Sequence, residues 1–243
     1  MSHTIALAGN PNTGKSTLFN LLTGLKQHTG NWPGKTVLRA EGELKTEKHV
    51  YKVIDLPGTY SLYSNSADEE VARDYIIFEK PDITLVVVDA TSLERNLNIA
   101  LQVLEMTDRA VLCVNLIDEA RKRGIHIDKE ALSKQLGIPV VLISAREKIG
   151  IIQLLKTIDR MIEGKLITKG YKIKYSPEIE KKIKELEPEI KQIFGDIFPA
   201  RWIALRILDG DKKLLESLKA YIQNQQFSSE KHPSAQGGCC HGV

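Results

Sequence analysis

The stretch GNPNTGKS, from Gly9 to Ser16, decides how the rest of the chain is interpreted. A short apolar run, TIALA, precedes it and an amphipathic pattern, TLFNLLTGL, follows it, so a strand, a glycine-containing loop and a helix come in succession. The glycines and the final Lys-Ser pair match the Walker A pattern, whose backbone N–H groups surround phosphates. The sequence therefore predicts a phosphate-binding loop.

Individual residues of this loop have separate predicted tasks. Lys15 is expected to reach the terminal phosphates, and the Ser16 hydroxyl to bind magnesium. Phosphate chemistry does not call for Asn10 or Asn12, and asparagine often braces turns through local hydrogen bonds, which is the role we expect of Asn10. The nucleotide-binding residues that we expect here are Gly9, Asn10, Pro11, Asn12, Thr13, Gly14, Lys15, Ser16 and Thr17.

Five apolar runs alternate with helical patterns along the first two thirds of the chain. Their near-continuous Val, Ile and Leu content is typical of parallel strands that are buried on both faces. The runs are Thr4 to Ala8, Val50 to Ile54, Ile83 to Val88, Ala110 to Val114 and Val140 to Ile143. Residues 36–55 form a predicted hairpin around the polar turn KTEKH. The fold class is therefore α/β, with a mixed, mostly parallel sheet flanked by helices.

The pattern changes after about Gly164, where we expect a small all-helical domain. An apolar stripe from Ile179 predicts a first helix, which Pro188 should kink or break. A second helix should end at Gly210, and Asp211 is a candidate cap for a third. The predicted organisation is a nucleotide-binding domain over 1–165, a helical domain over 170–226 and a disordered tail over 227–243.

Composition excludes several classes of protein. The 243 residues carry a net charge of only +3, spread along the chain, which argues against a nucleic-acid partner. The longest apolar runs fall far short of the roughly 18 residues that a membrane span needs. Cys113 lies in an apolar run, and no disulfide framework is apparent, so we expect a reducing, cytoplasmic environment. Cys239, Cys240 and His241 favour a flexible tail over a metal site.

A second set of motifs indicates which base is bound. NLID, from Asn115 to Asp118, follows an apolar run, and its carboxylate can accept from both N–H groups that guanine presents and adenine lacks. The tetrapeptide is weak alone, but DLPG precedes it and SAR follows it in the order typical of a P-loop GTPase fold. The predicted ligand is GTP or GDP. The further nucleotide-binding residues are Asn115, Asp118, Ser144, Ala145 and Arg146.

The loops between these motifs predict the remaining chemistry. Asp55 should hold magnesium through a water, while the Gly58 N–H meets the γ-phosphate. A second magnesium hydroxyl comes from Thr29 or Thr36, of which we favour Thr36. Thr59 follows Gly58, where many regulatory GTPases have a glutamine that orients water, so we expect slow intrinsic hydrolysis. Leu116 replaces the lysine of N-K-x-D, which suggests moderate nucleotide affinity.

The motifs together resemble the cytoplasmic amino-terminal domain of the ferrous iron transporter FeoB family, over Thr4 to Gln226. The discriminating segments are GNWPGKTV and ARWIALRILDGD. The resemblance implies that Asn12 contributes its side-chain oxygen to a potassium ion beside the β- and γ-phosphates, the alternative being that it only braces the loop. The expected cofactors are Mg²⁺ and K⁺, and the expected catalytic residues are Lys15, Asn12, Thr36 and Gly58.

The resemblance also implies the biological setting. It predicts slow, potassium-stimulated GTP hydrolysis on the cytoplasmic side of a membrane, coupled to Fe(II) uptake by a membrane-embedded domain of the same polypeptide. Whether the protein forms a homo-oligomer stays open. Two alternatives are a soluble ribosome- or tRNA-associated GTPase, which should add a basic RNA-binding module, and a nucleotide-occupied switch module with negligible turnover. Phosphate release with and without potassium separates the last from an enzyme.

Three other features have simpler interpretations. Trp202 lies on a helical stripe and is expected in the core. The charged run EIEKKIKELEPEIK is expected to be a solvated helix face. Two interpretations of Trp32, in GNWPG, are equally favoured: its side chain senses the nucleotide, or it docks on a neighbouring surface.

Overall fold

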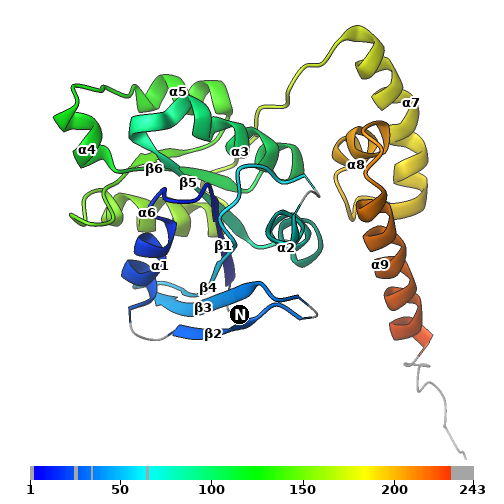
Figure 1. The fold of residues 1–243 in the computed structure, drawn as a ribbon, viewed down its shortest axis with the longest axis horizontal. Coiled ribbons are helices and arrows are strands. Elements are labelled where there is room, and N and C mark those ends of the chain that lie inside the picture. Colours follow the sequence, from blue (N-terminus) through cyan, green and yellow to red (C-terminus); the bar gives the residue numbers. More distant parts are fainter. Residues whose placement is uncertain (1–2, 25–26, 34, 64–65, 231–243) are drawn as a thin grey trace, which may run out of the picture.

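The computed structural model describes residues 3–24, 27–33, 35–63 and 66–230, which form a sheet domain and a group of helices beside it (Figure 1). The sheet has the order β2-β3-β4-β1-β5-β6-β7. Its strands are β1 (His3–Gly9), β2 (Gln27–Asn31), β3 (Leu38–Lys45), β4 (Val50–Asp55), β5 (Ile83–Asp89), β6 (Ala110–Asn115) and β7 (Val140–Leu142). Strands β4, β1, β5, β6 and β7 pair in parallel, while β3 is antiparallel to both β2 and β4. The mixed, mostly parallel sheet is confirmed.

Helices cover both faces of the sheet, so two hydrophobic cores form. One core packs α1 (Lys15–Thr23) and α6 (Ile151–Ile162) through Phe19 and Ile158. The other packs α2 (Ala67–Asp74), the π-helical turn η1 (Tyr75–Glu79) and α3 (Leu93–Met106). The short helix η2 (Ala90–Ser92), α4 (Ile117–Lys122) and α5 (Lys129–Leu136) complete this part. Burial on both faces explains the continuous apolar runs of the central strands.

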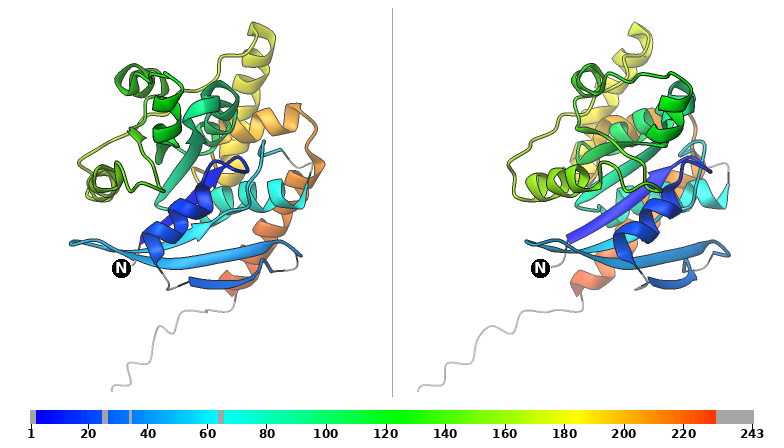
Figure 2. Two further views of the ribbon diagram at one scale, coloured as in Figure 1. Left: turned by 60° about the vertical axis from the view of Figure 1, so that its left-hand side comes forward. Right: turned by 90° about the vertical axis from the view of Figure 1, so that its left-hand side faces the viewer.

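The edge strand β2 was not predicted from the sequence. Its five residues, QHTGN, have neither apolar alternation nor β-branched content beyond Thr29. The strand forms because its backbone pairs with β3, where Thr29 lies opposite Ala40. Both views in Figure 2 show β2 at the outer edge of the sheet, next to the predicted hairpin of β3 and β4, which is confirmed.

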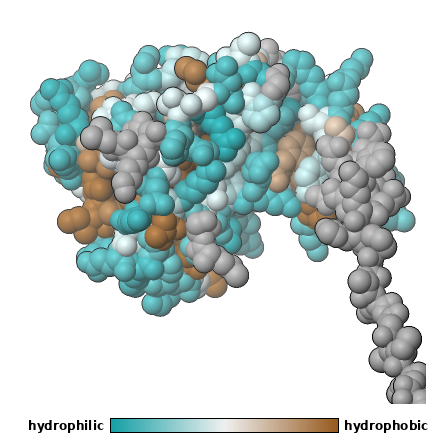
Figure 3. Space-filling view, turned by 90° about the horizontal axis from the view of Figure 1, so that it is seen from below, coloured by the Kyte–Doolittle hydropathy of each residue, from teal (hydrophilic) through white to brown (hydrophobic). Residues whose placement is uncertain are grey.

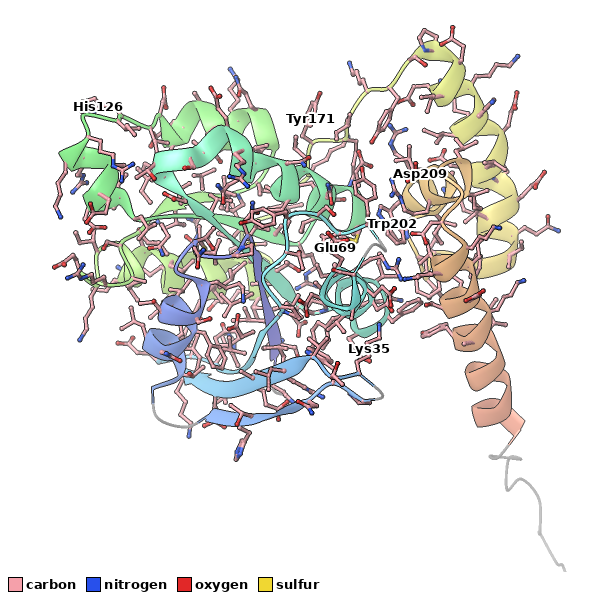
Figure 4. All side chains as sticks on the ribbon, viewed as in Figure 1. Lys35, Glu69, His126, Tyr171, Trp202 and Asp209 are labelled. Atoms are coloured by element: carbon pink, nitrogen blue, oxygen red, sulfur yellow. The ribbon has the colours of Figure 1, made fainter. Side chains whose placement is uncertain are left out.

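The helices α7 (Pro177–Phe194), α8 (Ala200–Leu208) and α9 (Lys212–Glu230) stand together beside α2 and α3 (Figure 1). Trp202 is 5% exposed, as predicted, and Figure 4 places it between α8 and the sheet domain. Asp211 caps α9, since its Oδ1 accepts from the Leu214 N–H at 3.0 Å. The charged run of α7 is largely exposed, while Ile183 and Ile190 are buried, which confirms a solvated face.

Two boundary predictions are corrected. Of the two effects predicted at Pro188, a kink or a break, the break is wrong, because α7 continues through Pro188 to Phe194. Ile183 and Ile190 are buried on either side of the proline, and this packing outweighs the loss of one backbone hydrogen bond. The predicted tail begins too early, since α9 extends to Glu230 and includes residues 227–230. The rest of that tail, 231–243, lies outside the described residues, as do Cys239, Cys240 and His241.

An extended strap, residues 165–176, connects α6 to α7 and lies against the sheet domain. The Lys169 and Tyr171 N–H groups donate to the carbonyls of Gly137 and Leu136, at 3.1 and 2.8 Å. Figure 4 shows Tyr171 on this connection. The Ile173 N–H donates to Glu105 of α3 at 2.8 Å, and the Ile173 carbonyl accepts from Arg201 of α8 at 2.7 Å. The strap thus joins α8 to α3 through one residue.

The surface is mainly hydrophilic on the face seen from below, with separate hydrophobic areas (Figure 3). Within the described part of the chain, no helix has both the length and the apolar character that a bilayer crossing requires.

Candidate nucleotide-binding site

The predicted phosphate loop joins β1 to α1 at the carboxyl edge of the parallel strands. Gly9 passes so close to β5 that a Cβ there would lie 2.3 Å from the Val87 carbonyl oxygen. Gly14 has a φ of 78°, and its Cβ would lie 2.3 Å from the Asn115 amide nitrogen. No acidic residue occupies the first turn of α1, so the positive end of that helix is open to an anion. At both positions a neighbouring atom therefore lies too close to leave room for any side chain, so glycine is required.

A cleft of about 500 Å³ lies over this loop. It is lined by Asn10, Pro11, Asn12, Gly14, Lys15, Ser16, Thr17 and Gly58. All of these except Gly58 come from the loop and the first turn of α1, and Gly58 comes from the segment after β4. The cleft thus brings the N-terminus of α1 and the Lys15 side chain to one place. The cleft is therefore the candidate phosphate site.

Three polar side chains meet at the base of the cleft. Lys15 is 7% exposed, and its Nζ donates to Asp55 Oδ1 and to the Leu56 carbonyl oxygen. The Ser16 hydroxyl donates to Asp55 Oδ2 at 3.2 Å. A hydroxyl and a carboxylate side by side are oxygen ligands of the kind that Mg²⁺ prefers, so these two residues fit the predicted metal role. The structure thus brings Lys15, Ser16 and Asp55 together, while their roles toward phosphate and magnesium stay predictions.

Asn12 and Asn10 differ in their environments. Asn12 is exposed at the rim of the cleft with a φ of 64°, a left-handed conformation that asparagine adopts more readily than other residues with a side chain. Asn10 is 4% exposed, and its carbonyl oxygen accepts from the Thr13 hydroxyl at 2.9 Å. Among the described residues its side-chain Oδ1 has no hydrogen-bond partner. The local hydrogen bond of this turn is thus made by the Asn10 backbone and the Thr13 side chain, and not by the Asn10 side-chain oxygen, which was expected to brace the loop.

Asn115 joins the phosphate loop to the predicted base-binding segments. It is 1% exposed; its Nδ2 donates to the Thr13 carbonyl, and its Oδ1 accepts from the Ala145 N–H, each at 2.9 Å. Because β1, β6 and β7 end at the same edge of the sheet, one amide can reach both loops. Asn115 is therefore a tie between the two halves of the site, which the motif alone did not predict.

Asp118, at the start of α4, is placed to receive hydrogen bonds. Partial burial opposes its charge, but hydrogen bonds from the Ser144 hydroxyl and from backbone N–H groups prevail and lower the pKa of Asp118. Its Oδ1 is shielded from solvent and has no hydrogen-bond partner in the described part of the chain. Leu116, between the two motif residues, has a φ of 62°. Asp118 is thus an ionised acceptor beside Ser144 and Ala145.

Arg146 takes a different position from its neighbours in the SAR motif. Ser144 and Ala145 are buried, whereas Arg146 is exposed and its guanidinium lies 3.9 Å from Glu147. The structure therefore brings Ser144 and Ala145 to the base-binding segments and leaves the Arg146 side chain at the surface.

The two candidates for the second magnesium hydroxyl lie in the segment between α1 and β3. Thr29 belongs to the edge strand β2, and Thr36 follows it in an exposed turn, where the Trp32 N–H donates to the Val37 carbonyl at 2.9 Å. The Trp32 ring packs edge-on against Tyr75 at 5.3 Å between centroids, and Arg39 lies 4.9 Å from its centre. Trp32 thus docks on η1 and β3. No described hydrogen bond links either threonine to Asp55, so the preference for Thr36 stays a prediction.

The 56–63 loop, after β4, closes the other side of the cleft. A Cβ on Gly58 would lie 3.3 Å from both Cα and N of Pro11, so this glycine rests against the phosphate loop. Thr59 is 4% exposed, and its N–H donates to the Gly9 carbonyl at 3.2 Å. The Thr59 side chain is therefore enclosed by the protein. Proline in the phosphate loop has a role that sequence reasoning missed, which is to form the surface on which Gly58 lies.

Comparisons with known proteins agree with this architecture. The family model described as ferrous iron transport protein B matches residues 3–158, and the model of the FeoB cytosolic helical domain matches residues 175–233. The Fe(2+) transporter FeoB of Methanocaldococcus jannaschii is 47% identical over 220 residues, which cover 90% of this chain and 32% of that protein. The chain thus spans about a third of the length of this curated relative.

Solved structures are similar over the same region. The cytosolic domain of T. maritima FeoB in apo form has a TM-score of 0.81 at 38% identity, covering 89% of this chain and 85% of that one. Its GMPPNP form has a TM-score of 0.80 at 37% identity, covering 88% of this chain and 84% of that one. The cytosolic domain of L. pneumophila FeoB has a TM-score of 0.81 at 34% identity, covering 94% of this chain and 89% of that one.

Proposed function

The chain belongs to the ferrous iron transport protein B (FeoB) family, and on that premise we propose that it binds guanine nucleotides and hydrolyses GTP to GDP and phosphate. The observation that carries the proposal is the tie made by Asn115, which holds the phosphate loop and the Asp118 segment in one site. GDP and GMPPNP forms of T. maritima FeoB, which are similar to this chain, add support.

The residues of the cleft have two tasks in this reaction, which are to bind the phosphates and to stabilise the charge that develops on them. The N–H groups of the loop and the Lys15 ammonium would bind the terminal phosphates, and Ser16, together with Asp55 through a water, would hold magnesium. When bound, Mg²⁺ neutralises charge that develops on the phosphate oxygens. Gly58 lies against Pro11, and its N–H would donate to the γ-phosphate. Breakage of the bond between the β–γ bridging oxygen and the γ-phosphorus then leaves GDP, with water supplying the new oxygen.

Base selection rests on Asp118. Its carboxylate is ionised and has an oxygen without a described partner, so it can accept from the ring N–H and exocyclic amine of guanine. Adenine offers no such pair of donors at that edge. Isothermal titration should therefore detect GDP binding and no comparable ADP binding. Asp118→Asn should weaken GDP binding and favour xanthosine diphosphate; unchanged GDP affinity in this variant would contradict the assignment.

Potassium stimulation is a separate part of the proposal. Asn12 is at the rim of the cleft, where its side-chain oxygen can contribute to a K⁺ site beside the phosphates. Because its φ is 64°, an alanine there would strain the backbone as well as remove the oxygen, whereas glycine removes the oxygen alone. We expect wild-type phosphate release to be faster in KCl than in NaCl, and Asn12→Gly to remove the difference.

A matched control exists for this variant. Lys80 also has a positive φ, 48°, and lies outside the cleft, so Lys80→Gly makes the same type of backbone change elsewhere. It should keep the wild-type response to potassium. Equal wild-type rates in the two salts would refute the cation site while leaving GTP hydrolysis intact.

The wider role follows from the family. We propose that this chain is the cytoplasmic part of a longer transporter and that its nucleotide state is coupled to Fe(II) uptake. A strain that lacks ferrous iron uptake should recover it when it expresses the whole polypeptide, and should fail to recover it with the Asp118→Asn form. Recovery with that form would separate nucleotide binding from transport.

A further inference from the structure

A hydrogen bond from the backbone of the 56–63 loop to a side chain of α3 attaches the loop to that helix. The Leu62 N–H donates to the side-chain oxygen of Gln102 at 2.6 Å, across forty positions of the sequence. Because the donor is a backbone N–H, the atom that faces it must be the oxygen of the Gln102 amide and not the nitrogen. The Leu62 side chain is 4% exposed and belongs to the core that α3 covers. This contact fixes where the loop crosses the helix.

The same loop touches the phosphate site at its other end. Gly58 rests against Pro11, and the Thr59 N–H donates to the Gly9 carbonyl at 3.2 Å. Leu62 is four positions after Gly58, a span of at most about 14 Å even when extended. Fixing Leu62 on α3 therefore limits how far the Gly58 N–H can move relative to the phosphate loop.

Other contacts of the loop are made by side chains at its surface. The Tyr60 ring is 52% exposed, with the Arg95 guanidinium 5.0 Å from its centre. The Ser61 hydroxyl donates to Glu69 at 2.7 Å, and Glu69 lies between the sheet and the helices α8 and α9 (Figure 4). Arg95 and Gln102 are seven residues apart on α3, so they lie on one face, two turns apart. Both contact the same loop, and Gln102 holds its backbone.

We propose that Gln102 is a positioning residue for GTP hydrolysis: by accepting the Leu62 N–H, it holds the 56–63 loop so that Gly58 faces the γ-phosphate. This inference rests on the proposed GTPase function and deepens it. Gln102 itself does not line the cleft, so it contributes nothing to binding of the base or of the β-phosphate.

The test compares two replacements of Gln102. Methionine has similar length and good helix propensity but no comparable acceptor, whereas glutamate keeps an acceptor oxygen. We expect Gln102→Met to lower kcat roughly three- to tenfold, the loss expected when one hydrogen bond no longer holds a group in place. GDP affinity should stay at the wild-type value. Gln102→Glu should restore most of kcat.

Amide hydrogen exchange gives a readout that is independent of turnover. The Leu62 amide should exchange faster in Gln102→Met than in wild type and return toward the wild-type rate in Gln102→Glu. Gln153, which is exposed on α6, provides the control, since Gln153→Met makes the same chemical change away from the loop. It should leave kcat, GDP affinity and Leu62 exchange unchanged.

The outcomes separate this inference from the proposed function. If wild-type protein binds no GDP and releases no phosphate, the proposed function fails. If wild type is active and Gln102→Met has the same kcat, the inference is overturned and the function stands. A parallel loss of kcat, GDP affinity and thermal stability in Gln102→Met, not restored by Gln102→Glu, also overturns it, because it indicates a purely structural role.

Discussion

Replacement of Asn115 by alanine tests whether one amide holds the two halves of the site together. The Asn115 side chain satisfies two groups, the Thr13 carbonyl and the Ala145 N–H, and is itself 1% exposed. Alanine leaves both partners buried without a hydrogen bond. At about 1–3 kcal/mol for each of the two unsatisfied groups, we expect a loss of about 2–6 kcal/mol in the free energy of unfolding. For a chain of this size, this corresponds to a fall in Tm of about 4–24 °C.

The assay is thermal unfolding of the nucleotide-free protein, followed by circular dichroism. Omitting nucleotide matters, because a ligand that binds only the folded state would itself raise Tm. Asn98→Ala is the matched control, since Asn98 is exposed on α3; its Tm should lie within about 2 °C of wild type. If Asn115→Ala also melts within that range, the amide does not connect the two loops as described, and the reasoning is refuted.

Three further predictions concern other parts of the molecule. Hydrogen bonds from Arg201 lower the pKa of Glu180 from 4.5 to about 2. The stability that the Glu180–Arg201 pair adds is therefore complete above pH 4.5 and is lost as the pH falls toward 2. The Tm difference between wild type and Glu180→Gln should shrink over that window, and a constant difference would contradict it. Complete burial raises the pKa of the Cys113 thiol, so mass spectrometry should find it unalkylated by iodoacetamide in the native protein and alkylated in guanidinium. Gly58→Ala places a Cβ 3.3 Å from Pro11, so phosphate release should slow while GDP affinity is kept. An unchanged rate of phosphate release would show that the 56–63 loop can shift away from Pro11 without affecting hydrolysis.

The sheet and the phosphate site were predictable because their signals are local or periodic. A parallel strand buried on both faces must be apolar along its length, and a phosphate loop must place glycine where backbone approaches backbone, as at Gly9. Motif order then indicated that Asp55 and Asp118 lie at the same edge of the sheet. These features depend on residues near one another in sequence or on a repeating pattern.

The features that the sequence did not reveal depend on distant partners. β2 forms only because β3 offers it a backbone to pair with, and nothing in QHTGN indicates that partner. Pro188 reads as a helix breaker until Ile183 and Ile190 are known to be buried on both sides of it. Gln102 resembles any polar residue on a helix until Leu62, forty positions earlier, is seen to donate its N–H to it.

The strap after α6 determines where the chain can be divided. In a fragment ending at residue 165, the carbonyls of Gly137 and Leu136 would lose the N–H groups that donate to them. The Glu105 carboxylate would lose the hydrogen bond from the Ile173 N–H. A fragment that continues past Ile173 keeps these backbone bonds; it loses the contact with Arg201 and the ion pairs of Arg73 with Asp211 and of Glu70 with Lys213. Anyone who wishes to express the sheet domain alone should therefore end it beyond Ile173, where trimming costs the fewest backbone interactions.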